Sequence, residues 1–175
     1  MKWIIFPLFL ISMTLFAQNS RQVADHQWSL NVLLPGVGYE YGVGDNATIA
    51  ADLAFGFSYR DSDFFGDDFG LYPVGTLQYR HYYNFERRLR KNKHIDRNTG
   101  NYVAPTIILQ SGQPIIGDLE SNTVGAVAAL YGLQRTGRKG FQWNFRVGPA
   151  YFFGDTNLDA GIVVDFKLGF VLGKK

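Results

Sequence analysis

Apolar and polar residues alternate along most of this chain. Between Thr48 and Arg60 the odd positions carry apolar or aromatic side chains, and the even positions carry small or polar ones. The segments 141–153 and 158–172 repeat this period of two, and the apolar positions of all three segments contain no charged residue. A period of two predicts β-strands, because successive side chains of a strand point to opposite faces of its sheet.

Several further segments have the composition of strands but alternate less regularly. Short turns rich in glycine, asparagine and aspartate separate the segments, which predicts an antiparallel meander. Pro35-Gly36 offers a turn that would divide the first segment, so this segment counts as one strand or two. A short turn of helix is expected near Arg87–Lys93. The further strand segments are Trp28–Gly42, Leu71–Phe85, Asn101–Ser111 and Asn122–Gln134.

The alternation alone leaves two architectures open, which differ in the face that points inward. A soluble lipocalin-type barrel has an apolar interior, whereas a transmembrane barrel turns its apolar face to lipid. The polar face is rich in small residues such as Ala50, Gly56 and Gly161, which suit a crowded interior. A charge on the other face would cost roughly 2–4 kcal/mol near the bilayer midplane, and none is present there. We therefore predict an all-β fold, an up-and-down antiparallel transmembrane β-barrel of eight strands, which requires the division at Pro35-Gly36.

A set of charged residues shares the face that is predicted to point inward. Charges enclosed in a barrel must be paired, and both signs are present. We predict a salt-bridged polar network that fills the interior and closes it to solutes. A catalytic or proton-relay use of these residues is the alternative, although eight strands leave little space for anything but side chains. The residues are Asp52, Arg80, Arg146, Asp165 and Lys167, with Glu40 as a sixth candidate.

The beginning of the chain predicts export. Residues 1–17 combine an early Lys2, a largely apolar run of 14 residues from Trp3 to Phe16, and a small residue at Ala17, which is the layout of a secretory signal peptide. The run is shorter than the roughly 20 residues of a membrane-spanning helix, although a retained anchor is the alternative. Residues 18–175 then form the barrel domain. The bulky Leu15 leaves the cleavage point open.

Composition and charge narrow the class of protein. Of the 175 residues, 46% are hydrophobic, 16% aromatic and only 18% charged, which excludes a disordered chain. The absence of cysteine excludes a disulfide scaffold, a thiolate zinc or iron–sulfur site and a lipoprotein anchor. A net charge of +2 gives no indication of a nucleic-acid partner.

The connections between the predicted strands carry charges of alternating sign. Three alternate connections are acidic, with Asp61–Asp68, Asp118 with Glu120, and Asp155 with Asp159. The connections between them, 86–100 and 135–139, are basic. Alternate connections of an up-and-down barrel emerge at the same end, so one rim is predicted to be acidic and the other basic. Counting back from a periplasmic C-terminus places the acidic loops outside the cell.

Three sequence features resemble the small outer-membrane barrels of Bacteroidota, a largely uncharacterised family. The features are the signal peptide ending Leu15-Phe16-Ala17-Gln18, the segment Pro35-Gly36-Val37-Gly38-Tyr39-Glu40-Tyr41, and Tyr79-Arg80-His81-Tyr82-Tyr83-Asn84 followed by a basic turn and Thr99-Gly100-Asn101-Tyr102. The resemblance spans most of the mature chain, through loose motifs. It implies an eight-stranded barrel in the outer membrane, in contact with its lipids and lipopolysaccharide, and it transfers no catalytic residue.

Other candidate motifs have structural explanations. His81-Tyr82-Tyr83-Asn84 is similar to the His-x-Ser-Asn motif of outer-membrane lipid A deacylases, but Tyr83 occupies the place of the nucleophilic serine. His81 shares the outward face with Tyr79 and Tyr83, so we interpret it as part of a girdle of aromatic residues at the membrane interface. Asp155–Asp159 starts like a calcium loop but lacks its later glycine and glutamate. The Asp61–Asp68 loop is expected to be solvated, with loose binding of divalent cations as the alternative. Gly36, Gly38 and Gly42 miss the dinucleotide-binding spacing by one residue.

The sequence therefore predicts a non-enzymatic outer-membrane barrel with a closed polar interior and a structural or surface-interaction role. No catalytic, cofactor or metal-binding residue is predicted, and the protein partner is open. Two rivals remain: a lipid-modifying outer-membrane enzyme, and a secreted soluble lipocalin-like barrel that binds an apolar ligand.

Overall fold

A computed structural model describes residues 22–60, 68–155 and 159–172, and the predicted signal peptide lies outside these residues. All strands belong to a single antiparallel sheet, which confirms the predicted all-β class. The strands are β1 (His26–Asn31), β2 (Gly36–Gly42), β3 (Ala47–Arg60), β4 (Asp68–His81), β5 (Gly100–Gln110), β6 (Ile116–Gly117), β7 (Val124–Thr136), β8 (Phe141–Gly154) and β9 (Ala160–Leu172). Two short helices, α2 (Phe85–Arg90) and the 3₁₀ helix η2 (Asp96–Asn98), lie between β4 and β5.

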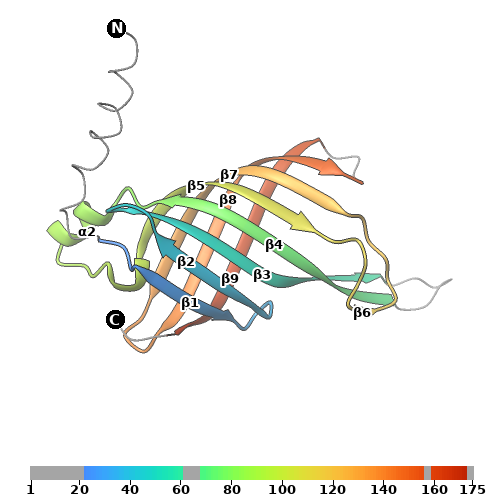
Figure 1. Cartoon of the computed structure of the whole chain (residues 1–175), viewed down its shortest axis with the longest axis horizontal. Helices are drawn as coiled ribbons and strands as arrows, with labels where there is room; N and C mark the ends of the chain where they lie inside the picture. The colour runs from blue at the N-terminus through green and yellow to red at the C-terminus, as the bar shows by residue number, and fades with distance from the viewer. Residues whose placement is uncertain (1–21, 61–67, 156–158, 173–175) are drawn as a thin grey trace, which may run out of the picture.

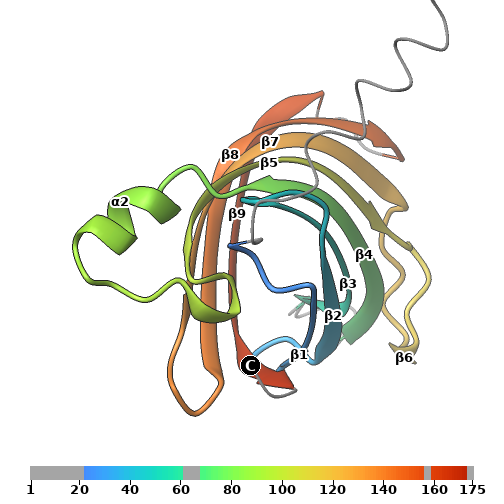
Figure 2. The same cartoon turned by 60° about the vertical axis from the view of Figure 1, so that its left-hand side comes forward.

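The pairings of the sheet close into a ring. The order is β3-β2-β1-β9-β8-β7-β5-β4, and β4 pairs again with β3 along fourteen residue pairs from Ala47↔His81 to Arg60↔Asp68. The two-residue strand β6 pairs with β4 alone. The strands curve around a common axis, with α2 beside one end of the ring (Figures 1 and 2).

The observed elements follow the predicted ones with a few instructive differences. The segment 28–42 is divided into β1 and β2, and the chain turns at residues 32–35, directly before Gly36. Strand β4 ends at His81 rather than at Phe85, because Phe85 already begins α2, two residues before the expected helical turn. Strand β6 and helix η2 carry no clear pattern in the sequence. No helix in the described part of the chain is long and apolar enough to cross a membrane.

The two faces of the strands point as the alternation predicts. On β3 and β9 the apolar positions face outward: Phe57 is 59% exposed and Ile162 is 73% exposed. The interleaved positions point into the ring, where Ala50 and Thr48 are buried. The orientation is therefore opposite to that of a soluble barrel with an apolar interior.

Connections alternate between the two ends of the ring. At one end, here called the basic end, lie the connections 82–99 and 137–140, with Arg87, Arg90 and Lys139 exposed. At the other end, the acidic end, lies the connection 111–123, and exposed Asp118 belongs to it. The acidic segment 61–67 and the end of the chain, 173–175, lie outside the described residues.

The β1–β2 hairpin is much shorter than its neighbours. Its last pairs toward the acidic end are Gly36↔Ala54 with β3 and Asn31↔Gly169 with β9, whereas β3 continues to Arg60. Figure 1 shows the hairpin ending well before the far end of β3. The wall of the ring is therefore low at this position.

Candidate functional site

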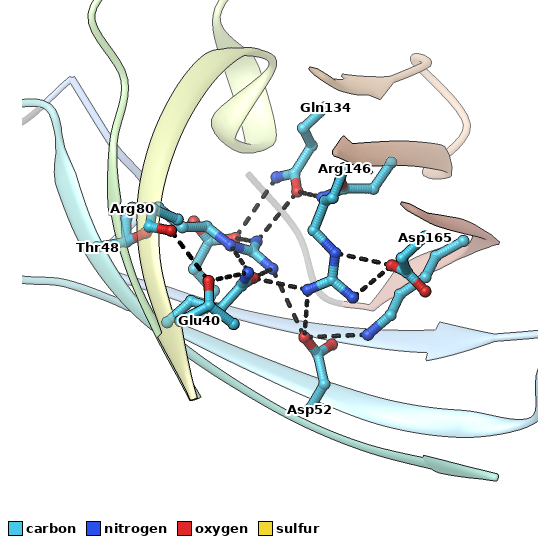
Figure 3. A network of polar contacts seen from close by, with 12 residues as sticks. Glu40, Thr48, Asp52, Arg80, Gln134, Arg146 and Asp165 are labelled. Atoms are coloured by element: carbon cyan, nitrogen blue, oxygen red, sulfur yellow. Dashed lines mark hydrogen bonds and ion pairs between the residues drawn. The ribbon is translucent and has the colours of Figure 1, made fainter. Parts of the chain in front are cut away.

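The charged residues predicted for the interior come together inside the ring (Figure 3). Four strands supply them: β3, β4, β8 and β9. In the β8–β9 ladder Arg146 lies directly opposite Asp165, so two residues distant in sequence are adjacent across the strands. On the neighbouring strand β2, Gly38 lies opposite Asp52, and a Cβ atom at Gly38 would lie 2.6 Å from an Asp52 carboxylate oxygen. The small residue thus leaves the space that the carboxylate occupies. The residues gathered here are Asp52, Arg80, Arg146, Asp165 and Lys167.

Asp52 is the centre of this group. Its Oδ2 atom lies 3.1 Å from Lys167 Nζ, 3.6 Å from an Arg80 guanidinium nitrogen and 3.7 Å from an Arg146 guanidinium nitrogen. The Asp52 side chain is only 8% exposed. One buried carboxylate therefore faces three cations contributed by three other strands, which ties together β3, β4, β8 and β9.

Glu40, the sixth candidate, belongs to the same network. Arg80 donates to Glu40 Oε2 at 3.0 Å. The other carboxylate oxygen, Oε1, accepts hydrogen bonds from the hydroxyls of Thr48 at 2.6 Å and Tyr82 at 2.7 Å. Both oxygens of this buried carboxylate are thus satisfied, as a charge removed from water requires.

Arg146 forms the second close ion pair. Its Nε donates to Asp165 Oδ2 at 2.7 Å, and its Nη2 contacts the same oxygen. Its Nη1 donates to Gln78 Oε1 at 2.8 Å, and Arg80 donates to that same amide oxygen through Nε and Nη2. Gln78 therefore holds the two guanidinium groups in one layer.

Uncharged amides, which are not among the residues predicted for the interior, complete the network. Asn144 donates to Gln134 Oε1 at 2.7 Å, Arg80 donates to the same oxygen at 3.2 Å, and Tyr102 donates to Asn144 at 2.9 Å. Gln78, Gln134 and Asn144 are all buried. The available signal was parity, since Gln78 stands two residues before Arg80 on the same strand and so points to the same side.

The charges of this layer balance. Three carboxylates, Glu40, Asp52 and Asp165, meet three cations from Arg80, Arg146 and Lys167. The cavity within the layer has a volume of about 20 Å³, room for about one water molecule. The side chains therefore leave little free space within the layer.

The side chains of the layer are joined mainly to one another. The hydroxyl groups of Thr48, Tyr82 and Tyr102 each donate to a carboxylate or amide of the network. Within the described residues no three histidine, cysteine, aspartate or glutamate side chains are grouped so that they could hold a metal ion. The arrangement can fix the strands to one another and block the passage of ions.

A buried apolar cluster lies at the basic end of the ring. The rings of Tyr82 and Phe85 stack with centroids 4.7 Å apart, and Tyr102 packs against Tyr82 at 5.3 Å. Val23 from the segment before β1 joins them, and the backbone N–H of Ala24 donates to the Asn98 side chain at 2.8 Å. The start of the described chain thus packs against this end of the ring.

The interior between the charged layer and the acidic end differs from the predicted polar filling. A cavity of about 250 Å³ lies there, and its walls are largely apolar. The prediction of a polar interior is thus wrong for this half, because inward positions near the acidic end carry aliphatic and aromatic side chains on β4, β5, β7, β8 and β9. The apolar lining residues are Val74, Ile108, Val124, Ala126, Leu130, Phe152 and Val163.

The remaining sequence candidates are not part of the network. His81 is partly exposed at the end of β4, and its neighbour Tyr83 donates through its hydroxyl to Tyr131 at 3.1 Å. Asp155 and Asp159 are exposed, and 156–158 between them lies outside the described residues. Most of the Asp61–Asp68 loop also lies outside them. Gly36, Gly38 and Gly42 are on strand β2.

Comparisons with known proteins identify no relative: no family model, no curated protein and no solved structure matches this chain.

Proposed function

We propose that the protein is an integral outer-membrane β-barrel of eight strands, closed to solutes, with a structural or surface-interaction role and no catalytic one. The observation that carries the proposal is the distribution of polarity across the wall of the ring. Large apolar side chains are exposed all around the outside, while six charged residues are enclosed and paired inside. Lipid accepts such an outer face, whereas soluble monomers rarely expose apolar patches of this extent.

Aromatic contacts on the outer face support a membrane interface near the basic end. The rings of Trp28 and Tyr39 lie 4.6 Å apart, and those of Phe141 and Phe170 lie 5.6 Å apart. At the same end, the Tyr83 hydroxyl donates a hydrogen bond to the Tyr131 hydroxyl. Tyrosine and tryptophan are enriched where a membrane meets water, because their rings are apolar and their polar groups remain hydrated.

The soluble alternative fits the structure poorly. A lipocalin-like barrel would enclose apolar residues and expose charges, but Leu53 is 58% exposed while the Asp52 side chain is 8% exposed. The lipid-modifying alternative needs an activated nucleophile, and in the charged layer the hydroxyls of Thr48, Tyr82 and Tyr102 donate to a carboxylate or an amide rather than to a histidine. We infer that the partners are outer-membrane lipids and lipopolysaccharide, with any protein contact made by the acidic loops.

Fractionation and heat modifiability test the proposal. The protein, expressed with its full N-terminus, should sediment with outer membranes, resist extraction by carbonate, and migrate faster on a gel when it is not boiled. A periplasmic marker protein provides the control for soluble material. Recovery in the soluble periplasm without detergent would refute the proposal. A change in the acyl pattern of lipid A when the gene is removed would refute the non-enzymatic assignment.

A further inference from the structure

The short β1–β2 hairpin leaves two strand edges unpaired. On its β1 side, β9 pairs only from Gly169 to Leu172, with one more contact from the Val32 N–H to Leu168 O. On the other side, β3 pairs with β2 only as far as Ala54, with one more bond from Phe55 N–H to Pro35 O. Among the described strands nothing continues the sheet between residues 56–60 of β3 and 160–167 of β9. The described strands therefore leave the wall open beyond the hairpin, toward the acidic end.

The turn of this hairpin has an unusual composition. Residues 32–35 read Val-Leu-Leu-Pro, and Val32, Leu33 and Leu34 are all exposed. Surface turns normally use glycine, asparagine, aspartate or serine, as the turn at Gly44-Asp45-Asn46 does. An exposed apolar turn halfway along the strands fits an environment of hydrocarbon, so the opening lies at the depth of lipid chains.

The apolar cavity inside the ring borders one side of this opening. Its lining includes residues 163–165 of β9, which belong to the stretch of that strand without a partner on the hairpin side. The cavity is therefore bounded there by a strand whose edge is unpaired. The cavity ends at the charged layer, where Thr76 and the Arg146–Asp165 ion pair line it.

We propose that one acyl chain of a membrane lipid enters the ring sideways through this opening and occupies the apolar cavity. The inference rests on the proposed membrane location. The cavity volume of about 250 Å³ is below the roughly 300–1,000 Å³ of common small-molecule pockets and suits a single slender chain. The charged layer stops the chain from going deeper.

Quenching of tryptophan fluorescence by brominated acyl chains tests this proposal. The mature chain is folded into phosphatidylcholine vesicles with bromine at mid-chain, after Trp28→Phe and Trp143→Phe remove the native signals. Single reporters are then introduced by Phe152→Trp in the cavity, Leu53→Trp on the outer face and Tyr102→Trp in the buried cluster at the basic end. We expect Phe152→Trp to lose as large a fraction of its emission as Leu53→Trp, and Tyr102→Trp to lose little.

A cavity-filling variant separates entry of a chain from quenching through the wall. Ala126→Phe fills the cavity and should abolish the quenching of Phe152→Trp. The control Ala129→Phe adds the same group to the outer face of β7 and should leave this quenching unchanged. Both variants must retain heat modifiability, which shows that they fold. If Leu53→Trp is quenched but Phe152→Trp is not, the inference is overturned. A strand of another protein would then be the better candidate for pairing with the free edges. Quenching that survives Ala126→Phe would overturn the inference too. If Leu53→Trp is itself unquenched, the proposed membrane location fails.

Discussion

Asp52 holds the charged layer together because it is paired with three cations. Asp52→Asn keeps the shape of the side chain but leaves the interior with one excess positive charge. Breaking a buried pair typically costs about 3–5 kcal/mol, and we expect a loss of that size in urea unfolding from lipid vesicles. Asp165→Asn is the matched control: it loses one ion pair on a side chain that is 22% exposed, and should cost less.

Restoring the charge balance should recover part of this stability. Combining Asp52→Asn with Lys167→Met removes one charge of each sign from the layer. Residues in contact are energetically coupled, so the double variant should lose less free energy of unfolding than the sum of the two single variants. Additive losses would show that the two side chains do not interact as the 3.1 Å contact indicates.

The outer face allows a second test at the level of a single residue. Leu53→Arg places a charge at the expected depth of the bilayer midplane and should cost about 2–4 kcal/mol in unfolding from vesicles. Ile49→Arg lies on the same face of β3, opposite Tyr41 and Tyr79 near the basic end, and should cost about 0–1 kcal/mol. Equal, small effects would indicate that both positions face water.

Parity made the charged residues predictable, and packing limited what else could be foreseen. The alternation of β3, β8 and β9 is regular, so the inward direction of Asp52, Arg146 and Lys167 followed from it. Which amides join the charges depends on how the strands are staggered around the ring, and Gln134 reaches the layer from a strand far away in sequence. A single sequence holds no direct record of that stagger.

At the scale of elements, the β1–β2 hairpin has the most informative turn. Leu33→Lys should cost about 2–4 kcal/mol if the turn lies in hydrocarbon, because a lysine on the lipid face of a barrel costs that much at mid-depth. Asp45→Lys places the same side chain in the polar β2–β3 turn at the basic end, where Asp45 is exposed, and should have little effect. Unfolding from vesicles measures both variants. A tolerated Leu33→Lys would place the turn in water and remove the physical basis for entry of a lipid chain.

The elements themselves were predictable to different degrees. Pro35-Gly36 marked the division between β1 and β2, because proline removes a ladder donor and ends a strand. The consequence of that division, an opening in the wall, required the register with β3 and β9. Strand β6 has only two residues and forms where the 111–123 connection folds along β4, so it depends on tertiary contact rather than on local pattern.

At the scale of the whole molecule, the two ends of the ring differ in charge, so each end can be assigned to one side of the membrane. The basic end carries Arg87, Arg90 and Lys139, and the acidic end carries Asp118 and Glu120. Because the C-terminal strand finishes at the basic end, we expect that end in the periplasm and the acidic loops outside the cell.

The chain has no cysteine, so single-cysteine variants test this orientation without background. In intact cells a membrane-impermeant maleimide should label Asp118→Cys and leave Lys139→Cys unlabelled. After the outer membrane is permeabilised, Lys139→Cys should react as well, which shows that its thiol is accessible in the folded protein. Both native side chains are exposed and belong to connections at opposite ends of the ring, so the variants differ mainly in the side of the membrane they report. Labelling of Lys139→Cys but not Asp118→Cys in intact cells would reverse the orientation, and it would assign the surface-interaction role to the basic connections instead.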